Sequence, residues 1–155
     1  MKKRNGFTLV EILIVVVILG ILAAIVIPQF SDASTEAKVS SLVSDLQSIR
    51  SQIQLYKIQH TDALPTAGGS TFAVAMTTYT MADGTPAAPQ APDPNGGVYG
   101  PYLQAIPKNP FVSDATYAVT VIEGTAAPTA DGMGWYFNTL TGAFNANDTA
   151  EHAAW

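Results

Sequence analysis

The sequence predicts an α+β protein in which a long N-terminal α-helix packs against a small antiparallel β-sheet of three or four strands. Residues 7–27 form an apolar run, and an amphipathic pattern continues beyond it to about residue 59. If straight, one helix over residues 8–59 would be about 75–80 Å long. The last third of the chain is rich in β-branched residues and turns, which is typical of strands.

The apolar run is long enough to span a bilayer. It holds 21 residues, of which only Thr8 and Glu11 are polar. A helix of that length covers about 30 Å, the thickness of the hydrocarbon layer. Residues 2–4 are all cationic and the next cation is Lys38, so we expect the N-terminus in the cytoplasm and the rest of the chain across the membrane.

A single carboxylate, Glu11, interrupts the run. In mid-bilayer a lone charge costs about 2.5–3.5 kcal/mol, but near the cytoplasmic edge the cost is smaller and the positive end of the helix dipole favours an acid. Two interpretations are open. Glu11 reaches the interface by snorkelling, or it waits for a cation that proteolysis creates, because a cut after Gly6 would free the α-amino group of Phe7 one helical turn away.

The segment resembles a known processing signal. Residues 2–6 read Lys-Lys-Arg-Asn-Gly and residues 7–11 read Phe-Thr-Leu-Val-Glu. This arrangement is similar to the type III signal of type IV prepilins and type II secretion pseudopilins, and the similarity continues to Pro28. The resemblance implies a pilin-like fold for the whole chain.

The same resemblance implies roles for individual residues. Residues 1–6 would be a leader peptide that prepilin peptidase removes by cutting after Gly6, and Phe7 would then be methylated. Glu11 would pair with the N-terminus of a neighbouring subunit during filament assembly. Residues 7–28 would be the transmembrane and assembly helix.

Two other kinds of segment share part of this pattern. A secretory signal peptide has an apolar region of about 7–15 residues that ends at an A-x-A-like site, whereas this run is longer and Ala23-Ala24 is followed by more large apolar residues. An uncleaved signal anchor accounts for the length and the cationic bias but not for Glu11.

Three residues are expected to shape the membrane helix. Gly20 and Ala24 lie four apart on one face; such residues are common in membrane helices and also permit close helix–helix approach. Pro28 predicts a kink or local melt near Ile27. The resemblance implies that residues 20–28 unwind most easily.

Residues 29–60 are expected to form an amphipathic helix that begins the periplasmic domain, residues 29–155. Its apolar residues recur at steps of three and four and form one stripe: Val39, Leu42, Leu46, Ile49, Ile53 and Tyr56. The stripe could be a coiled-coil seam, but it lasts barely three heptads and lacks flanking charges, so packing on the protein's own sheet is favoured.

Residues 61–114 hold most of the proline and glycine and are expected to be a loop. Within it, residues 72–76 form a short helix and residues 81–97 are irregular. The segment 100–111, which contains Pro-Lys-Asn-Pro-Phe, is similar to a pseudopilin loop. Its expected contacts with the helix stripe come from Tyr102, Leu103, Ile106 and Phe111.

Residues 115–146 are expected to form the antiparallel sheet. The first strand covers residues 116–122, and a hairpin follows at 135–145, with a positive φ at Gly142 in its turn. Residues 147–155 form a C-terminal tail. The sheet face that packs on the stripe is expected to carry Tyr117, Val119, Val121, Trp135 or Tyr136, and Phe144.

Composition and motifs exclude several functions. Without the three cations of residues 1–6, four Lys and Arg face twelve Asp and Glu, a formal charge of −8; because phosphates require clustered cations, we expect no nucleic-acid partner. No P-loop, nucleophile elbow or His-Glu-x-x-His motif occurs, so we expect no enzyme. His60 and His152 are expected at the surface. The chain has no cysteine and hence no disulfide.

No cofactor is expected, and calcium is the one candidate. The resemblance suggests this ion, because major pseudopilins bind Ca²⁺ in an acidic, glycine-rich C-terminal loop, which this chain does not clearly match. The residues that could supply hard oxygen ligands here are Asn145, Asn147, Asp148 and Glu151.

The resemblance thus implies a structural subunit of a homo-oligomeric helical filament, the type II secretion pseudopilus. It also implies a single-pass protein of the bacterial inner membrane that becomes a periplasmic or cell-surface filament. Expected partners are prepilin peptidase, the inner-membrane assembly platform, minor pseudopilins and the membrane. Two alternatives are a type IV pilin for adhesion or motility, and a signal-anchored periplasmic module that does not polymerise.

Overall fold

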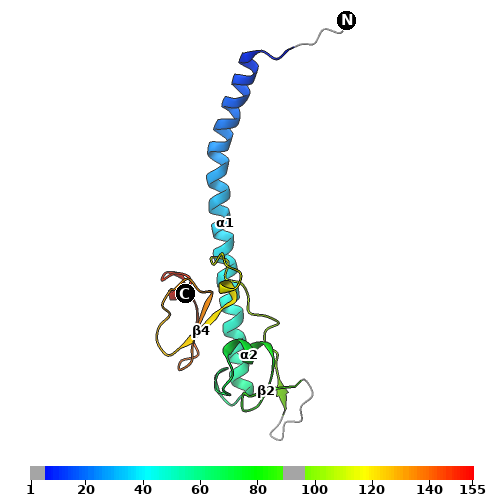
Figure 1. Cartoon of the computed structure of the whole chain (residues 1–155), viewed down its shortest axis with the longest axis vertical. Coiled ribbons are helices and arrows are strands. Elements are labelled where there is room, and N and C mark those ends of the chain that lie inside the picture. Colours follow the sequence, from blue (N-terminus) through cyan, green and yellow to red (C-terminus); the bar gives the residue numbers. More distant parts are fainter. Residues whose placement is uncertain (1–5, 89–96) are drawn as a thin grey trace. The chain divides into compact units, whose positions relative to one another are not determined.

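The structure, a computed structural model, describes residues 6–88 and 97–155 and has the predicted α+β class (Figure 1). The chain divides into two units, Met1–Lys38 and Val39–Trp155. The first unit is helical from Leu9 onward, and the second holds the sheets and the hydrophobic core.

Helix α1 spans Leu9–Gln59. It begins with a capping box: Thr8 Oγ1 accepts a hydrogen bond from the Glu11 N–H at 3.2 Å, and the Glu11 carboxylate accepts one from the Thr8 N–H at 2.8 Å. Pro28 lies inside the helix, which continues on both sides without a break. No local melt is present near Ile27, because a proline removes only one backbone donor and the neighbouring ladder bonds hold the helix. The alternative, a kink at Pro28, stays a prediction.

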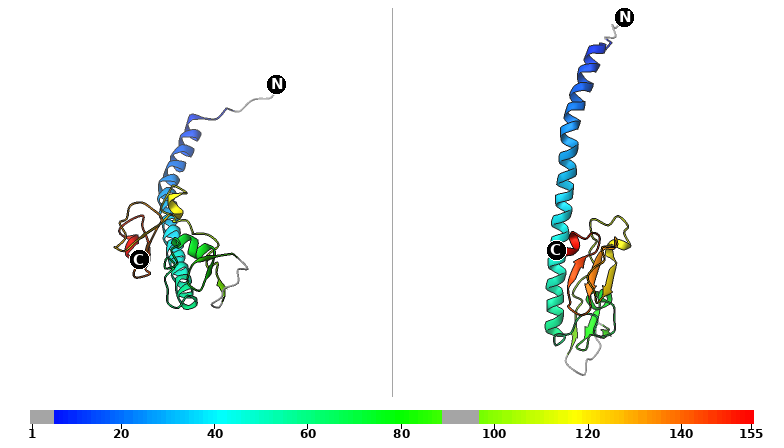
Figure 2. Two further views of the ribbon diagram at one scale, coloured as in Figure 1. Left: turned by 60° about the horizontal axis from the view of Figure 1, so that its bottom comes forward. Right: turned by 90° about the vertical axis from the view of Figure 1, so that its left-hand side faces the viewer.

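The core of the second unit forms around the predicted apolar stripe of α1. Helix α2 (Phe72–Thr77) and strands β5 (Trp135–Asn138) and β6 (Phe144–Ala146) cover the stripe (Figure 2). The buried stripe residues are Leu42, Leu46, Ile49, Ile53 and Tyr56. Full burial of such a side chain stabilises a fold by about 1.5–3 kcal/mol. The stripe therefore packs on the protein's own sheet and not in a coiled coil.

The C-terminal sheet has three strands in the order β4-β5-β6, and β4 spans Val121–Gly124. β5 and β6 form the predicted antiparallel hairpin, and Gly142 in its turn has a φ of 74°. The prediction that all strands are antiparallel is wrong, because β4 runs parallel to β5 with Val121 beside Trp135. Residues 125–134 carry the chain back to the start of β4, so both strands run the same way.

The first strand of this sheet starts later than predicted. Tyr117–Val119 form a 3-10 turn, η1, in which Asp114 Oδ1 accepts hydrogen bonds from the N–H groups of Thr116 and Tyr117 at 2.8 and 3.1 Å. Tyr117 is therefore 50% exposed and does not contribute to the buried face, contrary to the prediction. The predicted face residues that are buried in the core or pack against it are Val121, Trp135 and Phe144.

A second three-stranded sheet lies within the predicted loop, in the order β2-β1-β3. Its antiparallel strands are β1 (Tyr79–Met81), β2 (Pro86–Ala87) and β3 (Val98–Tyr99). Strands of two or three residues show no alternation, so the sequence does not predict them. The short helix expected at residues 72–76 is confirmed as α2. Of the stretch predicted to be irregular, residues 89–96 lie outside the described residues.

The proline-containing loop packs against the core of the second unit, as predicted. Its half-buried apolar residues are Tyr102, Leu103, Ile106 and Phe111. The Tyr102 hydroxyl donates to Gln59 Oε1 at 2.6 Å, and Trp135 Nε1 donates to the Pro107 carbonyl at 2.8 Å. These two bonds attach the loop to α1 and to β5.

Candidate functional site

The Glu11 carboxylate is held at the N-terminal end of α1. Its Oε2 atom accepts hydrogen bonds from the Thr8 N–H at 2.8 Å and from Thr8 Oγ1 at 2.7 Å. Among the described residues, the other carboxylate oxygen has no hydrogen bond, and Glu11 is exposed. Thr8 thus orients the acid while leaving one oxygen for a second partner, such as a cation.

The predicted cleavage bond, between Gly6 and Phe7, lies just before α1 in non-helical backbone. Phe7 is 84% exposed, and a Cβ built on Gly6 would meet no atom within 4 Å. Exposed backbone outside regular structure is readily cleaved by proteases. The bond is therefore sterically accessible, and the Thr8–Glu11 cap begins at the residue after Phe7.

The predicted packing residues Gly20, Ala24 and Pro28 all lie on the exposed part of α1. Their spacing of four places them on one helix face. A Cβ on Gly20 would meet nothing within 4 Å in the isolated chain, so packing within the chain does not require a glycine there. Such a face leaves room for another helix.

Every described residue from 6 to 38 is exposed in the isolated chain. By length and composition, α1 includes a segment that is apolar enough to cross a membrane. In water this surface would be strongly unfavourable, so lipid or other protein chains must cover it.

The four predicted calcium ligands are not brought together as one set. Asn145 donates through Nδ2 to the Ala153 carbonyl at 3.1 Å. Asn147 donates to Asp131 Oδ1 at 2.6 Å and accepts from the Ala130 N–H at 3.0 Å. Glu151, the last of the four, is exposed.

Both carboxylate oxygens of the remaining ligand, Asp148, have partners. Oδ1 accepts from Asn109 Nδ2 at 2.9 Å, and Oδ2 lies 2.5 Å from His152 Nδ1. Within the described residues, no group of three or more His, Asp or Glu is placed to hold a metal ion. The residues as arranged do not fit a calcium shell, and calcium binding stays a prediction.

The structure also shows two partners of Asp148, Asn109 of the proline-containing loop and His152 of the C-terminal tail, that sequence reasoning missed. Asn109 is buried and donates to the Gly134 carbonyl at 2.9 Å as well as to Asp148. His152, in the turn η2 (His152–Ala154), is 8% exposed, so its predicted surface position is wrong. One sequence signal was available for Asn109, which lies between Pro107 and Pro110. In such turns the side-chain amide of an asparagine commonly bonds to the backbone.

The fold and the N-terminal segment together define a class of protein. A basic N-terminal segment, an apolar helix with one early acid and a small α+β domain describe a membrane-anchored, pilin-like subunit. Residues 1–27 match the family model described as the prokaryotic N-terminal methylation motif.

Comparison with curated proteins identifies the family. The chain is 30% identical over 125 residues to type II secretion system core protein G of Vibrio cholerae, covering 81% of this chain and 77% of that protein. It is 32% identical over 115 residues to the Klebsiella pneumoniae protein of the same name, covering 74% of each. The chain therefore belongs to the family of type II secretion system core protein G, the major pseudopilins.

A more distant relationship links the chain to pilins. A fimbrial protein of Pseudomonas aeruginosa is 33% identical over 87 residues, which cover 55% of this chain and 56% of that protein. No solved structure gives a significant match.

Proposed function

We propose that this chain is the major structural subunit of a type II secretion pseudopilus and has no catalytic activity. The observation that carries the proposal is the N-terminal segment: an exposed apolar helix with one acid in its first turn, within the methylation motif. The names of the relatives that match most of the chain support the secretion role.

The proposed processing begins with prepilin peptidase, which cuts after Gly6 and methylates the new N-terminal Phe7. The mature chain stays in the bacterial inner membrane with its N-terminus toward the cytoplasm. The three cations of residues 2–4 support that orientation.

Assembly then depends on Glu11. In a medium of low dielectric constant, an unpaired carboxylate and an unpaired amine are both costly, and pairing removes both costs. We propose that Glu11 of one copy pairs with the Phe7 amine of its neighbour, and that Gly20, Ala24 and Pro28 lie where helices approach closely. An inner-membrane platform and minor pseudopilins are the proposed assembly partners.

A second candidate function is a type IV pilin that serves adhesion or motility. The fimbrial relative favours it, but that protein matches only about half of the chain. The two functions differ in outcome: a pseudopilin is required for release of secreted proteins, whereas a pilin produces surface fibres at its normal expression level.

The N-terminus of the mature protein tests the proposal most directly. Mass spectrometry of the protein from its host should show a chain that begins with N-methylated Phe7. An intact Met1, or a cut near Ala24, would instead indicate a signal anchor or a signal peptide. Deleting the gene and measuring secreted proteins and surface fibres then separates pseudopilin from pilin.

A further inference from the structure

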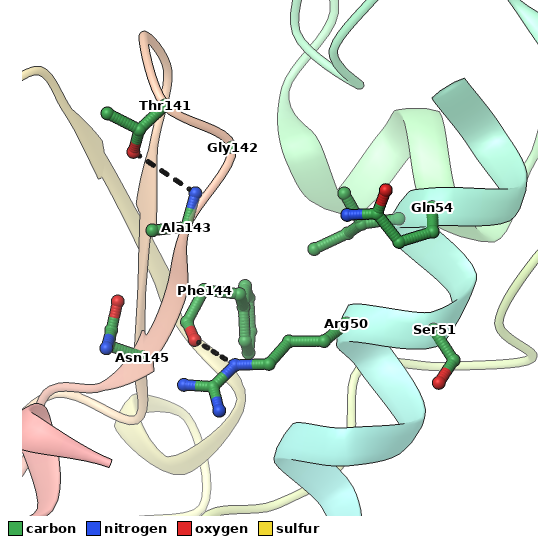
Figure 3. Close-up of a pocket in the computed structure, with 9 residues that line it drawn as sticks. Arg50, Ser51, Gln54, Thr141, Gly142, Ala143, Phe144 and Asn145 are labelled. Atoms are coloured by element: carbon green, nitrogen blue, oxygen red, sulfur yellow. Dashed lines mark hydrogen bonds between the residues drawn. The ribbon is translucent and has the colours of Figure 1, made fainter. Parts of the chain in front are cut away.

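A groove in the second unit separates the C-terminal half of α1 from the β5–β6 hairpin (Figure 3). Its volume is about 490 Å³, which is sufficient for one or two side chains of a partner. Ile53 and Phe144, both buried, form its apolar part, while Gln54 and Thr141 are exposed at its rim. No residue that lines the groove is acidic.

Arg50 reaches across this groove from α1 to β6, as Figure 3 shows. Its Nε donates to the Phe144 carbonyl at 3.0 Å, and the side chain is half-buried. That bond uses one of the five N–H donors of the guanidinium group. Within the described part of the chain, Arg50 makes no ion pair, although the cation Lys57 pairs with Asp62 at 3.0 Å.

An arginine held in this way is suited to bind a carboxylate. The Phe144 carbonyl fixes the plane of the fork, and a planar fork binds a carboxylate through two parallel hydrogen bonds. Arg50 is also one of only four Lys and Arg residues beyond residue 6, against twelve acids in the chain. The groove thus carries a positive charge and no lining acid, whereas the chain as a whole is acidic. Its charge is therefore complementary to an acidic surface of a second copy.

The first unit carries two acids that have no partner among the described residues. Asp32 and Glu36 are exposed on α1, and neither makes a hydrogen bond or ion pair among the described residues. They lie four apart on one helix face, where like charges destabilise a helix. Phe30, two residues before Asp32 and beyond the predicted membrane span, is 73% exposed. This segment therefore gains both charge neutralisation and burial when another chain covers it.

Most other exposed acids of the second unit are already engaged within the chain. Glu123 Oε1 accepts from the Phe72 N–H at 2.6 Å, and Asp83 Oδ1 accepts from the Thr85 N–H at 2.9 Å. Glu151 is the exception among the exposed acids of this unit, since no hydrogen bond to its side chain occurs in the described residues. Glu151 is a single acid, whereas Asp32 and Glu36 present two carboxylates on one face.

We propose that the Arg50 groove binds the Asp32/Glu36 face of a second copy of this chain, as a subunit contact of the filament. The proposal rests on the proposed filament function and adds to it a contact outside the membrane segment. In this contact Arg50 binds the carboxylates of the second copy, and the β5–β6 hairpin forms the side of the groove that positions the incoming helix.

Disulfide cross-linking tests the contact without changing Arg50. Because the chain has no cysteine, two full-length variants, Gln54→Cys at the groove rim and Ala33→Cys beside the acidic pair, are expressed together in the host with the assembly machinery. Oxidised filaments should contain a 54–33 dimer. The matched control replaces Gln54→Cys with Ser113→Cys, an exposed position away from the groove, which should give no dimer.

Charge exchange tests the chemistry. Arg50→Glu should lower filament yield by about tenfold, since the lost pair recurs at every copy, and Glu36→Arg in the same chain should restore the yield. Lys108→Glu, at an exposed cation outside the groove, should leave it unchanged. Near-ultraviolet circular dichroism of each full chain in detergent checks that it is folded, and Arg50→Lys tests the need for the planar fork.

The outcomes separate this proposal from the filament function. Wild-type filaments without a 54–33 dimer, or a folded Arg50→Glu variant that assembles normally, would overturn the groove contact and leave the filament function intact. A dimer between Gln54→Cys and Glu151→Cys alone would assign the groove to a different acid and also overturn it. Failure of the wild type to form any filament would overturn the proposed function itself.

Discussion

His60 shows at the scale of one residue how the end of α1 is attached to the small sheet. Its ring is fully buried and stacks on Tyr56 with ring centroids 3.8 Å apart. Nδ1 lies 2.9 Å from the Tyr56 carbonyl oxygen, which can only accept, so Nδ1 carries the hydrogen. Nε2 lies 3.0 Å from Thr80 Oγ1. His60 is therefore a core residue and not the surface residue that the sequence suggested.

This pair can be measured by a double-mutant cycle. Thr80→Val and His60→Phe each remove one side of the 3.0 Å contact between His60 Nε2 and the Thr80 hydroxyl, so each should lower the free energy of unfolding by about 1–3 kcal/mol. The double variant should cost less than the sum, because no buried group of the pair is left unpaired. Urea unfolding of the full chain in detergent measures all four forms. Additive costs would show that the bond does not couple the residues.

The raised pKa values of two tyrosines predict how the free energy of unfolding changes at alkaline pH. Burial, followed by the negative charge of Asp83, raises the pKa of Tyr56 to about 12. Burial also raises the pKa of Tyr102, with further contributions from Tyr56 and Tyr99. The unfolded chain loses these protons near pH 10. Stability should therefore be unaffected below about pH 10 and decrease from there to about pH 12.

Two tyrosine variants test this prediction. The buried Tyr56 hydroxyl has no hydrogen-bond partner in the described residues, so Tyr56→Phe should cost little at pH 7 and should make the alkaline loss of stability less steep. Tyr136→Phe is the control, because it removes a 2.9 Å bond to the Ala126 carbonyl and should lower stability at pH 7. The measurement is the unfolding midpoint across pH, with tyrosine absorbance followed in parallel. An unchanged alkaline slope in Tyr56→Phe would contradict the assignment.

At the scale of elements, one hydrogen-bond network joins the C-terminal loop to the rest of the domain. Asp148 connects Asn109 of the proline-containing loop to His152 of η2, and Asn109 extends the network to Gly134 at the start of β5. Without a disulfide, such buried side-chain bonds take the place of a covalent link between loops.

Asp148→Ala should therefore destabilise the full chain by about 1–3 kcal/mol, because Asn109 and His152 lose a shared buried partner. Glu151→Gln, at an exposed residue of the same loop, should have no effect. Thermal unfolding with and without millimolar Ca²⁺ measures both the network and the predicted metal site. A Ca²⁺-dependent rise of Tm that Asp148→Ala abolishes would show that calcium rearranges this loop.

At the scale of the whole molecule, the protein separates an exposed helical segment from a folded domain. The core belongs entirely to the second unit, whereas the described residues of the first unit have no buried side chain. The first unit is therefore buried only when lipid or other protein chains cover it. Mutations in the two units are therefore expected to affect different properties, assembly in the first and folding in the second.

Glu11→Ala tests that separation. The variant should still insert into the membrane and be cleaved, because the apolar run and the basic leader are unchanged. Filament yield should fall by about tenfold or more, since a neighbour's amine then lacks its partner. The unfolding midpoint of the second unit's core should stay the same. Normal filament yield from the cleaved variant would refute the proposed pairing.

The parts of the fold that the sequence predicted well depend on neighbouring residues. The extent of α1 follows from consecutive apolar residues and from a stripe with regular spacing, and the β5–β6 hairpin follows from its turn. The parts it missed depend on distant partners: β1, β2 and β3 are too short to show a pattern, and β4 pairs with β5 only because residues 125–134 cross back.

For the candidate site the division is the same. The sequence by itself determined the N-terminal segment, because charge order, helix length and the spacing of Gly6, Phe7 and Glu11 are properties of contiguous residues. Only the tertiary structure decided that Arg50 bonds to a carbonyl and to no acid of the described residues, and that His60 and His152 are buried. These contacts join residues that lie between 4 and 94 positions apart in the chain. A pattern of neighbouring residues does not indicate which distant side chains the fold brings into contact.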